Sequence, residues 1–111
     1  MNNFNTEWSR EDLEAYILIY CANANFEETQ NQRDFIKEHV SASNFKTIHK
    51  EFNKDNDYQS IQKIQTTIEK HGYSKDEIDE LFDEMKELFL SDENYDILEQ
   101  NLFRGLHHII G

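Results

Sequence analysis

The chain contains no proline and only three glycines among its 111 residues. Tight turns between strands depend on these two residue types, because proline fixes φ and glycine tolerates positive φ. Their scarcity argues against a β-sandwich or a β-barrel and favours helices joined by short loops. The sequence therefore predicts an all-α protein.

Cysteine and long apolar runs are also scarce. Cys21 is the only cysteine, which excludes a disulfide within the chain, and its apolar neighbours favour a small core residue over a reactive thiol. The longest apolar run, residues 15–22, is too short to span a bilayer. Residues 1–8 lack the charged and then apolar segments of a secretion signal. We therefore expect a cytoplasmic protein without membrane insertion.

Basic residues are outnumbered by acidic ones. The chain has 11 Lys and Arg against 23 Asp and Glu, a formal net charge of −12 with His neutral. Such a surface repels nucleic-acid phosphates and anionic membranes. We therefore expect no nucleic-acid partner, and a protein with a basic surface is the partner class that fits best. The sequence leaves the oligomeric state open.

Residues 13–24 form the most apolar stretch of the chain, with eight consecutive apolar residues at positions 15–22. Leu13, Tyr16, Ile17 and Tyr20 follow the spacing of one helix face, and Leu18 adds an apolar group on another. A helix that is apolar on all sides is buried. We predict that it is the central helix of a single domain over residues 1–111, a bundle of about six helices preceded by a polar segment at 1–8.

Helix boundaries are marked by short polar patterns. Asp57 is predicted to cap one helix and Gly72 to end it. Residues 41–44 are predicted to interrupt the helical pattern, and close packing is expected to explain Gly105 inside the last helix. Three capping boxes, in which Ser or Thr precedes Asp, Gln or Glu by three residues, are Ser9–Asp12, Thr29–Gln32 and Ser74–Glu77.

The helix predicted to follow Ser74 carries an acidic face opposite its apolar face. Each pair of like charges four residues apart destabilises a helix by about 0.2–0.5 kcal/mol. That this helix carries such pairs in spite of the cost is a hint that the charges have a use. We take this face as a candidate surface for docking a basic partner, and a merely solvated face is the alternative interpretation. Its members are Asp76, Asp79, Glu80, Asp83 and Glu87.

No sequence pattern requires catalysis or a bound cofactor. The histidines have no partners at zinc-ligand spacing, and we find no nucleophile–base arrangement and no glycine-rich phosphate loop. Residues 53–57 resemble the start of a calcium-binding loop. Tyr58 and Ile64, however, occupy the positions that require glycine and a bidentate glutamate. We therefore expect a protein that is not an enzyme and has no cofactor.

An offset of 67 residues aligns the two halves of the chain. It pairs Leu18 with Met85, and it also pairs two polar positions in the first half with acidic positions in the second: Asn25 with Asp92 and Gln32 with Glu99. A duplicated helix–loop–helix unit produces such a pattern, and so does chance alignment of two amphipathic helices.

At these positions the chain resembles the TerB-like family of tellurite-resistance proteins, over residues 9–110. The motifs that carry the resemblance are Ala24-Asn25-Phe26 with Gln32, and Ser91-Asp92-Glu93 with Glu99. The resemblance implies an all-α domain, divalent-metal binding by the acidic residues, and a role in stress response or phage defence within protein assemblies. Amides at positions 25 and 32 replace carboxylates in the first half. The resemblance therefore implies Asp92 and Glu99 as the metal ligands, if a divalent cation binds.

Three functional hypotheses follow. The first is a non-enzymatic, TerB-like interaction module that docks a basic protein through its acidic helix. The second is a metal-responsive domain in which an ion near Asp92 and Glu99 tightens the joint between the last two helices. The third is an acidic decoy that mimics DNA, which needs carboxylates spread over a long surface like phosphates.

Overall fold

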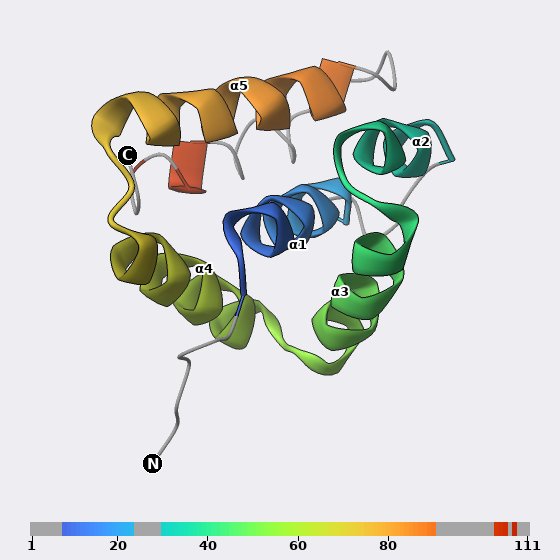
Figure 1. Ribbon diagram of the computed structural model, residues 1–111, viewed down its shortest axis with the longest axis horizontal. Helices are drawn as coiled ribbons and strands as arrows, with labels where there is room; N and C mark the ends of the chain where they lie inside the picture. The colour runs from blue at the N-terminus through green and yellow to red at the C-terminus, as the bar shows by residue number, and fades with distance from the viewer. Residues whose placement is uncertain (1–7, 24–29, 91–103, 107, 109–111) are drawn as a thin grey trace.

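The computed structural model describes residues 8–23, 30–90, 104–106 and 108, and every regular element among them is helical. Residues 104–106 and 108 are helical as well, and the chain forms an all-α bundle, which confirms the predicted fold class (Figure 1). The longer helices are α1 (Arg10–Ala22), α2 (Gln30–His39), α3 (Ala42–Lys54), α4 (Asp57–His71) and α5 (Lys75–Leu90).

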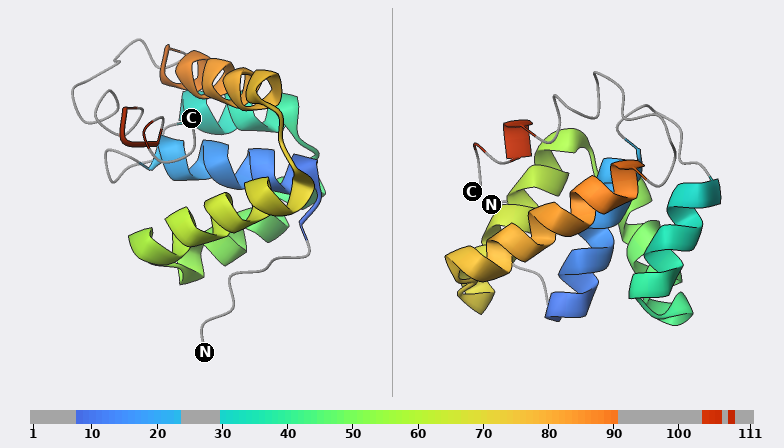
Figure 2. Two further views of the ribbon diagram at one scale, coloured as in Figure 1. Left: turned by 90° about the vertical axis from the view of Figure 1, so that its left-hand side faces the viewer. Right: turned by 90° about the horizontal axis from the view of Figure 1, so that it is seen from above.

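Helix α1 occupies the centre of the bundle. It contacts α2, α3, α4 and α5, with α2 and α5 on one side and α3 and α4 on the other (Figures 1 and 2). Leu13 and residues 15–22 are buried, so α1 is covered on all sides, as its composition predicts. Glu14 is the exception after the first turn, because this charged side chain is only partly buried, whereas Arg10 and Glu11 at the start of α1 are exposed.

The capping boxes that begin α1 and α5 are confirmed. Ser9 Oγ accepts from the Asp12 amide at 3.2 Å, and Ser74 Oγ accepts from the Glu77 amide at 3.2 Å. In both boxes the acidic side chain accepts in return from the capping residue's own amide, at 3.1 Å. Gly72 ends α4 with a φ of 62°, a conformation that favours glycine.

Two predicted helix starts are wrong by a few residues. Helix α3 begins at Ala42, inside the predicted break, because Ser41 Oγ caps it by accepting from the Asn44 amide at 3.2 Å. Helix α4 is capped by Asn56 and not by Asp57. Asn56 Oδ1 accepts from the amide of Gln59 at 2.8 Å, whose side chain accepts in return at 2.9 Å.

Two further predictions concern Gly105 and the capping box of Thr29 with Gln32. Close packing does not explain Gly105, because a Cβ atom added there would have no neighbour within 4 Å. Thr29 lies outside the described residues, so the capping box predicted for α2 stays a prediction. Gln32, the other member of that box, is buried in α2.

A polar network ties α1 to the corner between α3 and α4. The Tyr16 hydroxyl donates to Asp55 Oδ2 at 2.6 Å and lies 2.9 Å from Ser60 Oγ, so burial and the nearby carboxylate raise the Tyr16 pKa far above its usual value. Lys63 Nζ lies 2.8 Å from Asp55 and 3.2 Å from Glu51. This network supplies hydrogen-bond partners to the polar groups that α1 buries. It therefore fixes the position of the central helix in addition to the apolar packing.

Candidate functional site

The predicted acidic face lies on the outer side of α5. Asp76, Asp79, Glu80, Asp83 and Glu87 are all exposed, as expected for a docking surface or a solvated face. Asp92 and Glu99, the predicted metal ligands, lie outside the described residues. The same holds for the aligned Asn25, so the metal site and the internal duplication stay predictions.

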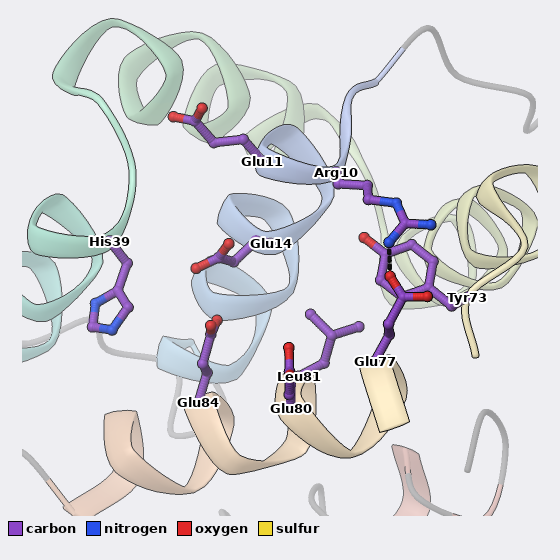
Figure 3. Close-up of a pocket in the computed structure, with 9 residues that line it drawn as sticks. All are labelled: Arg10, Glu11, Glu14, His39, Tyr73, Glu77, Glu80, Leu81 and Glu84. Carbon is purple, nitrogen blue, oxygen red and sulfur yellow. Dashed lines mark ion pairs between the residues drawn. The ribbon is translucent and has the colours of Figure 1, made fainter. Parts of the chain in front are cut away.

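A cleft lies between α1, α2 and α5, beside the acidic face, and has a volume of about 430 Å³. Glutamates dominate its lining, and Glu80 belongs both to the cleft and to the acidic face (Figure 3). We call it the acidic cleft. Its lining residues are Arg10, Glu11, Glu14, His39, Tyr73, Glu77, Glu80, Leu81 and Glu84.

One end of the acidic cleft already holds a guanidinium group. Arg10 forms an ion pair with Glu77, and its Nη2 donates to the carbonyl oxygen of His71 at 3.1 Å. Its guanidinium carbon lies 4.4 Å from the centre of the Tyr73 ring, a cation–π contact. The cleft therefore shows, within this chain, how a carboxylate, a carbonyl and an aromatic ring hold an arginine.

Two carboxyl groups meet at the other end of the cleft. Glu14 extends from α1 and Glu84 from α5, and their side chains point toward each other (Figure 3). Burial, a hydrogen bond shared with Glu14 and repulsion from Glu14, Glu87 and Glu80 raise the pKa of Glu84 to about 8. At neutral pH the pair therefore holds a proton, because two adjacent carboxylates resist full ionisation.

One oxygen of this pair has no hydrogen-bond partner among the described residues. It is Glu84 Oε2, which is buried. A buried acceptor without a donor costs free energy, which a ligand that brings donors would recover. This orphaned oxygen belongs to a side chain that lines the acidic cleft.

The remaining walls are fixed by their own hydrogen bonds. Glu11 Oε1 accepts from the Ser41 amide at 3.1 Å, which anchors this glutamate to the start of α3. His39 Nδ1 donates to the Phe35 carbonyl at 2.9 Å, and the two rings stack with their centres 4.3 Å apart. The histidine ring is therefore oriented by α2, with its Nε2 atom left for a neighbour or for solvent.

The cleft does not present a preformed metal site. Within the described ranges, no three His, Cys, Asp or Glu side chains are placed so that they could hold a metal ion together. A divalent cation needs several oxygen ligands converging on one point. The arrangement suits an organic cation, which makes separate hydrogen bonds to separate carboxylates.

Sequence reasoning predicted Glu80 as a site residue and gave Glu77 only a capping role, and it did not indicate Glu14 or Glu84. A signal for both was present in the sequence. Glu14 is the only charged residue in the apolar stretch 13–24, and Glu84 stands at core spacing, three residues after Leu81. A charged residue at an apolar position of a helix indicates a buried polar contact or a ligand site.

No family model, curated protein or solved structure matches the chain. None of the helices in the described part of the chain is long and apolar enough to cross a membrane. The fold and the cleft therefore rest on this chain's own geometry, and the resemblance to the TerB-like family stays a prediction.

Proposed function

We propose that this domain is a non-enzymatic interaction module whose acidic cleft receives a lysine or arginine side chain of a protein partner. The observation that carries the proposal is the orphaned Oε2 atom of Glu84, buried opposite Glu14 in a glutamate-lined cleft. A cationic side chain would supply the missing donor and neutralise the pair.

The energetics favour such a ligand. When a guanidinium or ammonium group enters, Glu84 releases its proton and both carboxylates become charged acceptors. Hydrogen bonds to ionised groups are about twice as strong as neutral ones. Arg10 supports the proposal, because a guanidinium is already held at the other end of the same cleft.

The acidic face extends the site outward. Glu80 lines the cleft, and the exposed Asp76, Asp79, Asp83 and Glu87 lie on the same helix. A single sign of charge around a binding site steers oppositely charged partners and raises association rates. We therefore assign the cleft to anchoring one side chain and the acidic face to attracting the basic surface around it.

Charge reversal on α5 tests the module. Immobilised Asp83→Lys/Glu87→Lys protein is expected to lose partners that the wild type recovers in a pull-down, with an unchanged circular dichroism spectrum, because both side chains are exposed. Glu38→Lys/Glu69→Lys is the matched control, since it changes two exposed glutamates on α2 and α4. Unchanged recovery of every partner by the α5 variant would contradict the proposal.

The cleft itself is tested in the same pull-down. Glu14→Gln/Glu84→Gln keeps the shape of both side chains but removes their charge. We expect it to lose the same partners as the α5 variant, because an amide pair attracts a cation far less than a carboxylate pair does. Partners that depend on α5 but not on this pair would show that the acidic face acts without the cleft.

A further inference from the structure

A second surface of the domain has the opposite charge. A groove of about 490 Å³ is lined by residues of α2 and α3, which follow each other along the chain at one edge of the bundle (Figure 1). Four of the chain's 11 Lys and Arg residues line it. We call it the basic groove, and its functional side chains are Arg33, Lys37, Phe45, Lys46, His49 and Lys50.

Three lysines of the basic groove form no ion pair with the described part of the chain. Within residues 30–90, which the structure describes without a gap, no ion pair forms at Lys37, Lys46 or Lys50. Lys63, by contrast, is paired with two carboxylates. In a chain with twice as many acidic as basic residues, a cluster of unpaired lysines marks a surface that favours an anion.

Two aromatic rings lie among these cations. The Phe45 and His49 rings have their centres 5.4 Å apart, and Lys37 Nζ lies 5.4 Å from the centre of the Phe45 ring. Both rings are only partly buried. Ala42, the first residue of α3, also lines the groove and brings the positive end of the helix dipole to it.

We propose that the basic groove binds a mononucleotide, with its phosphates on the lysines and its base against Phe45 and His49. Ligand pockets are typically about 300–1,000 Å³, and this groove has a suitable volume. Lysine is a common phosphate ligand, and a partly exposed aromatic ring offers a stacking surface for any base. This site is independent of the acidic cleft and of its proposed partner.

Charge distinguishes the nucleotide from larger anions. The net charge of −12 repels a nucleic acid or an acidic protein along its whole length, and it also disfavours self-association. A mononucleotide touches only the groove, where the local charge is positive. The aromatic rings in turn favour a base-bearing phosphate over an inorganic one.

Calorimetric titration of the full chain with ATP tests the proposal, with tripolyphosphate and a glutamate-rich peptide as competing probes. We expect ATP to bind with a submillimolar dissociation constant and more tightly than either probe. Lys46→Glu/Lys50→Glu should weaken ATP binding at least about tenfold, because it reverses two of the contacting charges. Lys75→Glu/Lys86→Glu is the matched control, with the same change of charge at exposed positions on α5.

Nuclear magnetic resonance provides a second readout that is independent of these variants. Bound ATP should give contacts between its base protons and the Phe45 ring protons, and Phe45→Leu should weaken ATP binding but not tripolyphosphate binding. The proposal is overturned if ATP does not bind at millimolar concentration or if tripolyphosphate or the peptide binds as tightly. An equal loss of binding in the control variant would overturn it too.

Discussion

Replacing Tyr16 by alanine is expected to lower the free energy of unfolding by about 3–5 kcal/mol, the range for removing a buried aromatic side chain. Tyr16 is fully buried in α1, with its ring centre 4.5 Å from that of Trp8 and 5.8 Å from that of Phe52. The substitution empties the middle of the core and also removes the donor to Asp55. Urea denaturation followed by circular dichroism measures the loss.

Two control variants separate the contributions to this loss. Tyr16→Phe keeps the ring but leaves Asp55 and Ser60 without the hydroxyl, so we expect a smaller loss of about 1–3 kcal/mol. Tyr58→Ala removes the same side chain from a position that is 62% exposed. We expect it to cost at most about 0.5 kcal/mol, as is usual for surface changes. Equal losses for Tyr16→Ala and Tyr58→Ala would contradict the central position of α1.

Glu84→Gln is expected to raise the melting temperature at pH 9 by about 4 °C or more, the shift that corresponds to about 1 kcal/mol in a domain of this size. The pKa of Glu84 rises from 4.5 to about 8 on folding, so between these pH values the folded state keeps a proton that the unfolded state releases. The contribution of this group to the free energy of unfolding is therefore complete below pH 4.5. It is lost progressively as the pH rises from 4.5 through about 8.

The glutamine variant removes the contribution of Glu84 to this pH dependence, because its side chain is neutral at every pH. The amide can also donate a hydrogen bond to Glu14. Melting curves from pH 5 to pH 9 should show a fall for the wild type that is smaller in the variant. Glu80, Glu87 and His39 also surround the pair, and Glu14 keeps its carboxyl group in the variant, so part of the fall will persist. Glu87→Gln, an exposed neighbour, is the control, and an equal effect from it would contradict the role of Glu84.

The fold was predictable where the signal is local. The apolar run at 15–22 is long enough to require burial on all sides, and capping pairs such as Ser74 with Glu77 lie within one helical turn. The cap of α4 was not predictable, because Asn56 and Asp57 are both good capping residues. A distant contact distinguishes them, since Asp57 Oδ1 accepts from the Tyr20 hydroxyl at 2.5 Å and Asn56 takes the cap.

The site was predictable only in part, for a similar reason. The acidic residues of α5 are evident from its helical periodicity, and Ser74 with Glu77 fixes where that periodicity begins. The pairing of Glu14 with Glu84 depends on how α1 packs against α5, which no local pattern specifies. The basic groove was missed as well, because its lysines and aromatic residues are divided between two helices and are diluted by the acidic excess.

The most direct test of the acidic cleft is the number of protons released when a cationic side chain binds. A short blocked peptide rich in arginine and lysine would be titrated into the domain at pH 7, in two buffers of different ionisation enthalpy. We predict the release of about one proton per bound peptide, because the cation displaces the proton held by Glu14 and Glu84. Glu84→Gln should bind more weakly and release none. Equal affinity for both proteins, without proton release from either, would contradict the proposed function.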